Sequence, residues 1–461
     1  MKKLYFSLFF IFILFSGMFA TPLRIIGMGS LDLIVEDESN RINLFDYGRN
    51  VAGLYNDERE SSIKSYITYG KIKYSDTSGT TGPEISYWGI NLPDYFSPPI
   101  DIENTMKTLA FLEGIPTGGI VTFRTEGGFA FCGMGAYSSK KIKLETFVID
   151  ASSPIGCLII SKKFGMYSVG LSGGYTKLTF RDNNDNFETW QTLKSIKGGI
   201  AVCLSPLLEI GFSGGYAFPE RGFKIVASEF EDLYQGNAYS GGVQVIAKVP
   251  GLLKFGTKID FLRTDLDEKI IEGGVSLESG EVSETDFNFG SRLLFSSILF
   301  PLKAGVNYNY RRIHSIYNTI FISDFDSSSS VTDFGLGVSY AMPLFTPGIQ
   351  YNLYNKTSTD NLDNGESTNS NKWDVRFGGE VPLTIITLRA GYVIAKEDPD
   401  TNRENDESKS RSITLGAGIQ FPLQPFKIEV AYVNKETQPV DNPDDSKETE
   451  NSIYAALKLR F

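Results

Sequence analysis

The sequence predicts an all-β fold, a transmembrane antiparallel β-barrel of 14 to 18 strands with an amino-terminal plug-like segment. Three observations predict it: an amino-terminal secretion signal, a two-residue alternation of apolar and polar side chains in the second half of the chain, and a last strand that ends on an aromatic residue. The 461 residues include 46 Gly, 34 Phe and 23 Tyr but a single His, a composition typical of strands, turns and aromatic girdles.

The start of the chain has the features of a secretory signal peptide. Lys2 and Lys3 precede an apolar stretch over residues 4–15, which is too short to cross a membrane as a helix. We expect cleavage after Ala20, so that residues 1–20 are the signal. No later stretch is apolar enough for a transmembrane helix, and the mean hydropathy is −0.12.

From about residue 193 onward the chain repeats one hairpin unit: an alternating strand, a short turn with proline, a second alternating strand and a longer polar loop. Proline suits a strand end because it has no N–H to donate to a neighbouring strand. Each strand is expected to cover about 9–11 residues, the length that a tilted strand needs to cross a bilayer. The turn prolines are Pro206, Pro250, Pro301, Pro343, Pro382 and Pro422.

The strand count follows from the same alternation. Counting back from the chain end gives fourteen strands by residues 165–180, and an even number is expected for a single-chain bacterial barrel. Upstream, six more runs are candidate strands: residues 63–71, 85–91, 120–126, 129–137, 141–149 and 155–162. Some of them are expected to fold inward or to lie outside the wall, so the predicted range ends at eighteen.

The final strand predicts the location of the protein. Leu457, Leu459 and Phe461 share one face, while Lys458 and Arg460 occupy the other. This strand resembles the terminal strand of bacterial outer-membrane barrels, which the assembly machinery reads. The resemblance implies the bacterial outer membrane as the location, with outer-membrane lipid and the assembly machinery as partners. Residues 61–461 are assigned to the barrel.

Residues 21–60 are assigned to the plug-like segment because they contain Gly27-Met28-Gly29 and the run Asn50-Val51-Ala52-Gly53-Leu54. This arrangement resembles the start of the FadL-type family of hydrophobic-compound transporters and of the related PorV-type proteins. The resemblance implies a segment folded into the barrel as a plug, with Gly27, Gly29, Asn50, Ala52, Gly53 and Leu54 as its motif. Val51 stands where the family has proline, so the rigid turn is lost. An ordinary strap in or under the barrel is the alternative.

The face opposite the apolar one should line the lumen. The strand register places nine basic residues there. Six are taken as lumen-lining candidates, Lys254, Lys258, Arg311, Arg376, Arg389 and Lys427, and the other three are Lys303, Lys458 and Arg460. They outnumber the carboxylates assigned to the same face, which are Asp260, Asp374, Glu380 and Glu429. One interpretation is a basic interior that favours anions or the head group of an amphipathic acid. The other is that the inward charges pair with one another.

Little in the sequence supports an enzyme. His314 and Ser315, just past a predicted strand end, are the material for a Ser–His hydrolase, but the chain offers no other convergent site, and we expect no catalytic activity. Cys132, Cys157 and Cys203 are an odd, widely spaced set that fits apolar wall positions better than disulfides or a metal site. No cofactor motif occurs, and the net charge of −11 disfavours nucleic acid.

Two functions remain from different classes. The first is a passive outer-membrane channel for a hydrophobic or amphipathic small molecule, which rests mainly on the family resemblance. The alternative is a non-conducting, PorV-like barrel that holds a secreted or surface partner protein through long acidic loops, at residues 397–410 and 437–451. Neither loop has the residue spacing of an EF-hand calcium site.

Overall fold

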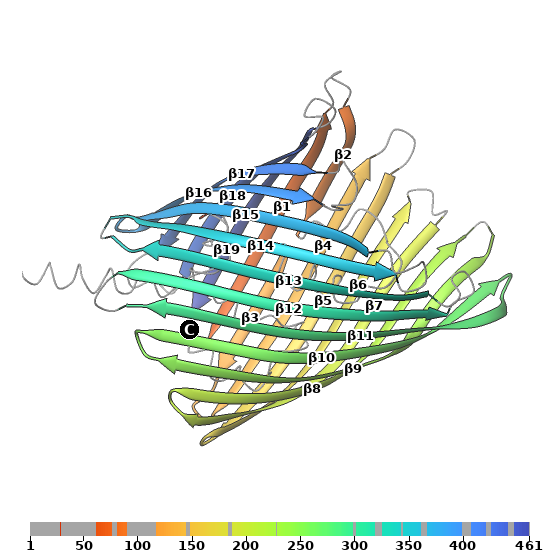
Figure 1. Ribbon diagram of the computed structural model, residues 1–461, viewed down its shortest axis with the longest axis horizontal. Helices are drawn as coiled ribbons and strands as arrows, with labels where there is room; N and C mark the ends of the chain where they lie inside the picture. The colour runs from red at the N-terminus through yellow and green to blue at the C-terminus, as the bar shows by residue number, and fades with distance from the viewer. Residues whose placement is uncertain are drawn as a thin grey trace, which may run out of the picture.

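The structure is a computed structural model. It describes residues 28, 61–75, 81–89, 117–143, 148–182, 187–226, 228–297, 301–318, 325–342, 344–360, 367–398, 407–420, 426–440 and 447–460. Within these residues the secondary structure is β-strand and turn (Figure 1). No helix of the described residues is long and apolar enough to cross a membrane.

Nineteen antiparallel strands form a single sheet. In chain order they are β1 (Ser62–Ser75), β2 (Thr81–Trp88), β3 (Thr117–Arg124), β4 (Phe129–Lys143), β5 (Val148–Phe164), β6 (Tyr167–Asp182), β7 (Phe187–Ser205), β8 (Leu208–Ile225), β9 (Phe230–Val249), β10 (Leu253–Glu272), β11 (Val275–Ser296), β12 (Leu302–Asn318), β13 (Phe325–Tyr340), β14 (Thr346–Asp360), β15 (Ser367–Pro382), β16 (Ile386–Asp398), β17 (Ser408–Gln420), β18 (Phe426–Pro439) and β19 (Lys447–Arg460).

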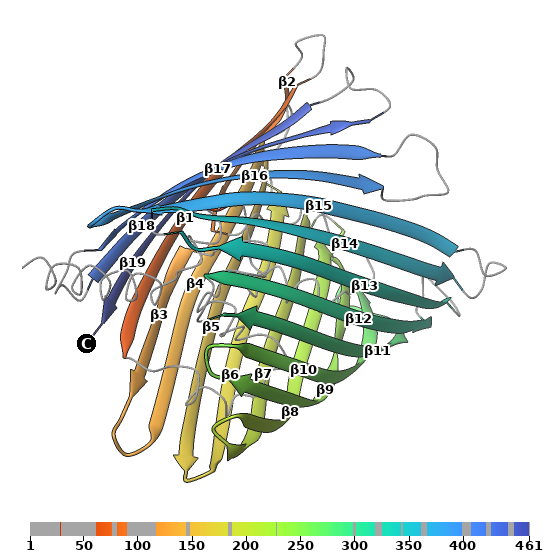
Figure 2. The ribbon, with the colours of Figure 1, turned by 60° about the vertical axis from the view of Figure 1, so that its left-hand side comes forward.

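The sheet closes into a barrel of eighteen strand positions. From β3 to β19 each strand pairs with the next, and β1 pairs with β19 along its whole length (Figure 2). β2 and β3 share one position between β1 and β4, because β2 pairs with one half of each neighbour and β3 with the other half. The predicted antiparallel barrel of 14 to 18 strands is therefore confirmed, at its upper limit and with an even number.

The two ends of the barrel differ. One end, which we call the turn end, carries the connections β5–β6, β7–β8 and β9–β10, where Pro206 and Pro250 lie between strands as expected. The opposite end is the loop end, and here the longer connections β16–β17 and β18–β19 include residues 399–406 and 441–446, which lie outside the described residues. Not every connection there is long: Gly273 and Gly274 alone join β10 to β11, both with positive φ, as a tight hairpin requires.

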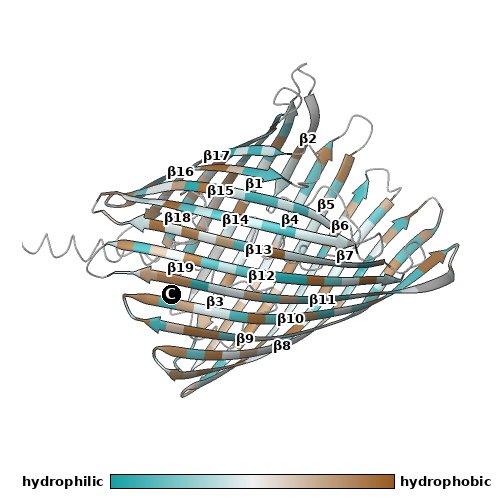
Figure 3. Ribbon diagram, in the orientation of Figure 1, coloured by the Kyte–Doolittle hydropathy of each residue, from teal (hydrophilic) through white to brown (hydrophobic). Residues whose placement is uncertain are grey.

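Apolar side chains point outward through the middle of the wall. On β17, Ile413 and Leu415 are each 52% exposed, whereas Thr414 between them is buried. The same alternation of apolar and polar residues is visible along most strands (Figure 3). An apolar outer surface on a closed sheet is stable in hydrocarbon, because the backbone N–H and C=O groups of the wall are bonded to neighbouring strands and no sheet edge is left open.

The predicted strand length of about 9–11 residues is wrong. β9 and β10 have 20 residues each and β11 has 22. On β10 the apolar face changes sides: Ile259 and Phe261 are exposed on the outside, whereas Leu262 and Leu266, farther toward the loop end, are buried on the inside. The wall therefore continues beyond the membrane as a water-facing sheet, with polar residues outside and apolar residues inside.

This extension corrects three further expectations. His314 lies inside β12 rather than past its end. The acidic loops are shorter than residues 397–410 and 437–451, because β16 to β19 extend into both of them. The expected run 141–149 is not one strand, since β4 ends at Lys143 and β5 begins at Val148. In each case the backbone ladder continues into polar sequence, which the hydrophobic pattern alone does not reveal.

The wall is continuous at the point where β2 ends and β3 begins within their shared strand position. The backbone N–H of Gly89, just after β2, donates to the Thr68 carbonyl of β1 at 2.9 Å, and the Thr68 N–H donates to the Thr117 hydroxyl of β3 at 3.3 Å. Gly89 has a φ of +78° and a Cβ there would lie 2.9 Å from the Tyr137 carbonyl oxygen, so the position requires glycine. Residues 90–116, which connect the half-strands, lie outside the described residues.

A tyrosine ties the first and last strands together. Tyr87 of β2 crosses over Gly70 of β1, where a Cβ would lie only 2.1 Å from the ring atom Cζ. Its hydroxyl is hydrogen-bonded to Glu450 and, at 2.7 Å, to the Ser452 hydroxyl, both on β19. Three strands, β2, β1 and β19, are thus joined by one buried side chain at the point where the barrel closes.

Candidate functional site

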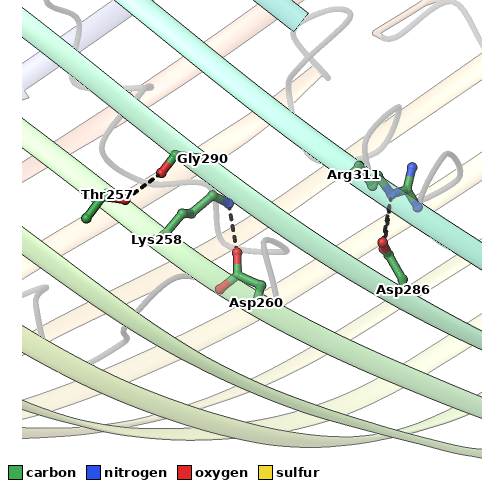
Figure 4. Close-up of polar contacts among 6 residues, drawn as sticks. All are labelled: Thr257, Lys258, Asp260, Asp286, Gly290 and Arg311. Atoms are coloured by element: carbon green, nitrogen blue, oxygen red, sulfur yellow. Dashed lines mark hydrogen bonds and ion pairs between the residues drawn. The ribbon is translucent and has the colours of Figure 1, made fainter. Parts of the chain in front are cut away.

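Charged side chains on the inner face of β10 to β18 form a series of ion pairs, which we call the ion-pair belt. The pairs are Lys258–Asp260 at 3.1 Å, Arg311–Asp286 at 3.0 Å, Arg376–Asp374 at 2.7 Å, Arg389–Glu380 at 2.8 Å, Arg389–Glu429 at 2.9 Å and Lys427–Glu429 at 2.9 Å. The first two are drawn in Figure 4. Five basic groups face five carboxylates, so the charges of these pairs balance.

Arg389 is the most connected member of the belt. It reaches from β16 across β17 to bind Glu429 on β18, and it binds Glu380 on β15 as well. The crossing is open because β17 has Gly418 there: a Cβ would lie 3.2 Å from Glu429 Oε1 and 3.3 Å from Arg389 Nη1. The Arg389 side chain is 2% exposed and that of Glu429 is 1% exposed. The sequence thus places a glycine where two buried charges must meet.

Arg311 and Asp286 form the second buried pair of the belt. The Arg311 Nε–H donates to both carboxylate oxygens of Asp286, at 3.1 and 3.0 Å, between the neighbouring strands β12 and β11. Both side chains are buried. Charge-assisted hydrogen bonds to both oxygens fix the orientation of the carboxylate as well as its charge.

Amide side chains extend the belt across β14. Gln350 donates to Asn352 at 2.9 Å, and Asn352 donates to the Asp374 carboxylate at 2.7 Å, the oxygen that also accepts from Arg376. An amide accepts a hydrogen bond on its oxygen and donates one from its nitrogen, so Asn352 connects Gln350 to Asp374 on the next strand. The inner face of β14 and β15 is therefore a chain of satisfied polar groups.

The inner face on the other side of the barrel has an apolar cluster, flanked by buried polar residues such as Thr122, Ser138 and Ser153. Ile120, Cys132, Met134, Ile155, Cys157 and Ile159 form what we call the apolar patch. They come from β3, β4 and β5, which lie side by side, and β4 to β7 lie behind β10 to β14 in Figure 1. Cys132 is completely buried, and none of the three cysteines forms a disulfide within the described residues. The barrel interior is therefore divided between an apolar patch and an ion-pair belt.

Much of the inner face is buried. Barrels of 16–18 strands often enclose an aqueous channel, whose lining is wet. Here Thr68, Ser153 and Glu268 are each 0% exposed, and Glu429 is 1% exposed. These inward positions, on β1, β5, β10 and β18, do not line an open water-filled pore.

The structure places the six predicted lumen residues on the inner face of their strands. Five of them form the ion pairs of the belt, and Lys254 shares the inner face of β10 with Lys258. Sequence reasoning missed carboxylates on β11, where Asp286 and Glu284 point inward and are buried. The alternation along β11 could have revealed them. Asn288 pairs with the inward Arg311, and Asp286 and Glu284 lie two and four residues before Asn288, so they share its inward face.

The plug motif and the chain end are only partly described. Gly27, Gly29, Asn50, Ala52, Gly53 and Leu54 lie outside the described residues, and so does Phe461. Met28, between the two glycines, is described and is 1% exposed. Leu457 and Leu459 lie on the outward face of β19, where both are exposed.

His314 and Ser315 do not form a catalytic pair. As neighbours on β12 they point to opposite sides of the wall. His314 Nε2 lies 2.8 Å from Asp326 Oδ1 on the outer side, whereas the buried Ser315 hydroxyl donates to Glu284 at 3.4 Å on the inner side. This geometry removes the one hydrolase arrangement that the sequence suggested, and no cluster of metal-binding side chains occurs in the described ranges.

A second polar cluster lies inside the extension at the loop end. The Tyr234 hydroxyl of β9 donates to Glu268 of β10 at 2.5 Å, and the Arg221 guanidinium lies 5.6 Å from the Tyr234 ring centre. Asp232 completes the cluster. Burial, together with the negative charge of Glu268, raises the pKa of Asp232 to about 6, although Arg221 and Tyr234 oppose the shift. The outer face at this height carries Arg263 and Asp265, so the cluster lies beyond the membrane.

We expect Asp232→Asn to raise stability at pH 7 by about 1 kcal/mol, a value reduced for the partial exposure of the group. The folded pKa of Asp232 lies above the ordinary 3.8, so the native state binds the proton more tightly and stability falls as pH rises from about 4 to about 6. Urea midpoints at pH 4 and pH 7.5 measure this. Wild type should lose more stability over the interval than Asp232→Asn, while Asp267→Asn, at an exposed carboxylate of the same extension, should follow wild type. Parallel behaviour of all three chains would refute the assignment.

The closed sheet, the apolar outer surface and the buried polar interior define the class: a membrane-spanning β-barrel. No protein-family model matches the chain, and no curated protein matches it. Solved structures match at low identity. A Pseudomonas aeruginosa FadL homologue shares 11% identity over 96% of this chain and 98% of its own, with a TM-score of 0.38.

Two other solved structures are similar over somewhat less of the chain. The ferric citrate transporter FecA shares 9% identity over 87% of this chain and 79% of its own, with a TM-score of 0.44. The copper transporter OprC shares 7% identity over 88% and 81%, with a TM-score of 0.47. At these values the similarity assigns neither a family nor a cargo.

Proposed function

We propose that the protein is an outer-membrane channel, closed at rest, that passes a small amphipathic molecule. The observation that carries the proposal is the division of the interior between the apolar patch on β3 to β5 and the ion-pair belt on β10 to β18. The hydrocarbon part of an amphipathic molecule would pack against the apolar patch, and its polar head group would form hydrogen bonds with residues of the ion-pair belt. A molecule with both parts would contact both sides of the interior on its way through.

The pairing of charges in the ion-pair belt also indicates which head groups the interior would accept. A basic interior would favour anions, but the basic residues of the belt are paired with carboxylates. Selection of the head group would therefore rest on hydrogen bonding rather than on net positive charge. Neutral and acidic amphipathic molecules are both compatible with this interior.

The closed resting state is supported by burial. Inner-face residues such as Glu268 and Thr68 are fully buried, and so is Met28 of the segment that resembles the FadL-type plug. We infer that residues 21–60 act as the plug and that passage requires this segment to move.

The test compares wild type with a variant lacking residues 21–53, both refolded and inserted into lipid bilayers. We expect wild type to conduct ions weakly and the deletion to open a steady conductance, because the plug no longer blocks the interior. Uptake of a fluorescent fatty-acid-like probe into liposomes should change in the same variant. If both forms remain folded, heat-modifiable on a gel and closed, transport fails as the function.

A matched pair of methionines tests the apolar patch. Met134→Gln places an amide in the patch, and we expect the rate of probe uptake to fall about ten-fold, since burying an amide without a partner costs about 1–3 kcal/mol. Met166→Gln makes the same change in the exposed β5–β6 turn and should leave uptake unchanged. Equal rates for the two variants would show that the probe does not use the patch.

The alternative is a non-conducting barrel that holds a protein partner at the loop end. The extension of β9 to β11 beyond the membrane favours it, because this part of the wall offers a rigid surface outside the lipid. A closed, inert deletion variant would direct the search to that surface.

A further inference from the structure

Basic side chains gather on the outward face of one side of the barrel, near the loop end. They come from β1, β4, β6 and β7, and they lie just beyond the outward apolar residues. We call this set, with the acidic residues between them, the head-group patch: Lys71, Lys73, Glu84, Lys141, Lys143, Asp150, Lys177, Arg181, Glu188 and Lys194. Seven basic residues stand against three carboxylates, in a chain whose net charge is −11. The patch is therefore a local reversal of the charge of the protein.

The strand register brings the members of the patch together. Lys73 and Lys143 both pair with Glu84, from the two sides of β2. Arg181 pairs across to Asp150 on β5 and to Glu188 on β7, and Lys194 pairs with Tyr175 on β6. Neighbouring strands thus present one continuous row of charged groups, from β1 through β2, β4, β5 and β6 to β7.

The carboxylates of the patch are already matched. Lys71 lies 2.5 Å from Glu84, Arg181 lies 2.7 Å from Glu188, and Lys141 lies 3.8 Å from Asp150. The remaining lysines form no ion pair with another residue of the described ranges, and all but the half-exposed Lys177 are exposed: Lys73, Lys143, Lys177 and Lys194. Lys73 and Lys143 also interact electrostatically with Glu84. Because seven cations stand against three carboxylates, part of the positive charge of the patch is available to an anion outside it.

The position of the patch relative to the membrane indicates which kind of anion it faces. On the membrane side of the lysines lie outward aromatic residues: Tyr69 and Trp88, whose ring centres are 4.9 Å apart, then Tyr137 and Tyr175, all but the first more than one-third exposed. Aromatic residues of this kind mark the boundary between hydrocarbon and head groups. Lys71 and Lys177 follow Tyr69 and Tyr175 by two residues toward the loop end, and Lys141 follows Tyr137 by four, whereas Lys194 lies level with Tyr175. Most of the lysines therefore lie just beyond the aromatic residues, at the depth expected for lipid phosphates.

The other side of the barrel differs at the same height. Beyond Phe218, Tyr239 and Phe261 the outward positions of β8 to β10 carry Glu220, Gln235 and the Arg263–Asp265 pair. No comparable excess of lysine occurs there. The excess of lysine on β1 to β7 is therefore not repeated on β8 to β10.

We propose that the head-group patch binds phosphorylated lipid head groups in the leaflet at the loop end. Ammonium groups on flexible side chains suit phosphate oxygens, and a basic residue near a charged membrane surface contributes binding through both charge and hydrogen bonds. Four lysines spread along β1, β4, β6 and β7 match a cluster of lipid phosphates rather than a single ion. The bound lipids would hold this side of the barrel at a fixed height in the membrane.

The test is native mass spectrometry of the full chain in detergent, with phosphatidic acid as the phosphorylated lipid and phosphatidylcholine as the zwitterionic comparison. Wild type should retain phosphatidic acid in preference. Lys73→Gln with Lys143→Gln should reduce its retention about ten-fold, and Lys177→Gln with Lys194→Gln should do likewise. The preference should also weaken at high salt.

The control removes the same charge elsewhere. Lys224→Gln with Lys269→Gln changes two exposed outward lysines of the extension, on β8 and β10, and should bind phosphatidic acid as wild type does. A heat-modifiable band on a gel shows that each variant is folded. Equal losses in the patch and control variants, or equal retention of the two lipids by wild type, would overturn the proposal.

Discussion

Replacing Arg389 by methionine is expected to lower the free energy of unfolding by about 3 kcal/mol. The guanidinium is buried and binds Glu380 at 2.8 Å and Glu429 at 2.9 Å. Its removal leaves two inward carboxylates facing each other across β17 without the cation that lies between them. Urea unfolding of the refolded barrel in lipid vesicles, followed by tryptophan fluorescence, measures the loss.

An exposed ion pair provides the matched control. Lys372 on β15 binds Glu397 on β16 at 2.9 Å, but the side chains are 44% and 47% exposed. Lys372→Met should therefore cost less than about 1 kcal/mol. Adding Glu429→Gln to Arg389→Met should restore part of the loss, because one of the two unneutralised charges is gone. If Arg389→Met costs no more than Lys372→Met, burial does not strengthen the belt.

Gly70→Val is expected to cost about 3 kcal/mol and to weaken the junction of β1 and β19. The Tyr87 ring occupies the place of the missing side chain, with Cζ only 2.1 Å from an ideal Cβ. Valine would force the ring out and break its hydrogen bonds to Glu450 and Ser452. The measurement is the urea midpoint, together with the temperature at which the folded band on a gel disappears.

Two comparison variants separate the causes. Gly256→Val makes the same change at an inward glycine of β10 where a Cβ meets nothing within 4 Å, so it should cost little. Tyr87→Phe keeps the ring and removes the hydroxyl, so it should cost about 1–2 kcal/mol. A Gly70→Val chain as stable as Gly256→Val would show that Tyr87 does not hold the seam.

Both expectations concern side chains that join strands far apart in sequence. Arg389 links β15, β16 and β18, and Tyr87 links β2 with β19, 363 residues along the chain from Tyr87 to Glu450. In each case a glycine on the strand between provides the crossing. Inner-face glycines of this barrel thus have a specific use where two polar partners are separated by one strand.

Local sequence by itself determined that the chain is a barrel of alternating strands. The alternation around Ile413 and Leu415 is a property of consecutive residues, and a strand with one apolar face must place that face against lipid or a core. Pro206 and Pro250 mark turns for an equally local reason, since proline cannot continue a strand ladder. The fourteenth strand from the end, expected over residues 165–180, is β6 (Tyr167–Asp182).

The tertiary structure alone decided what depends on contacts between distant strands. Whether Arg389 is an isolated charge or a partner of Glu429, two strands away, depends on rotamers and register, not on its place in an alternating run. The half-strands β2 and β3 are separated in sequence by residues 90–116. They share one position in the wall because both pair with β1 and β4. Strand length escaped prediction because apolar residues change from the outer to the inner face at the membrane boundary, and the hydrogen-bond ladder continues regardless of which solvent surrounds it.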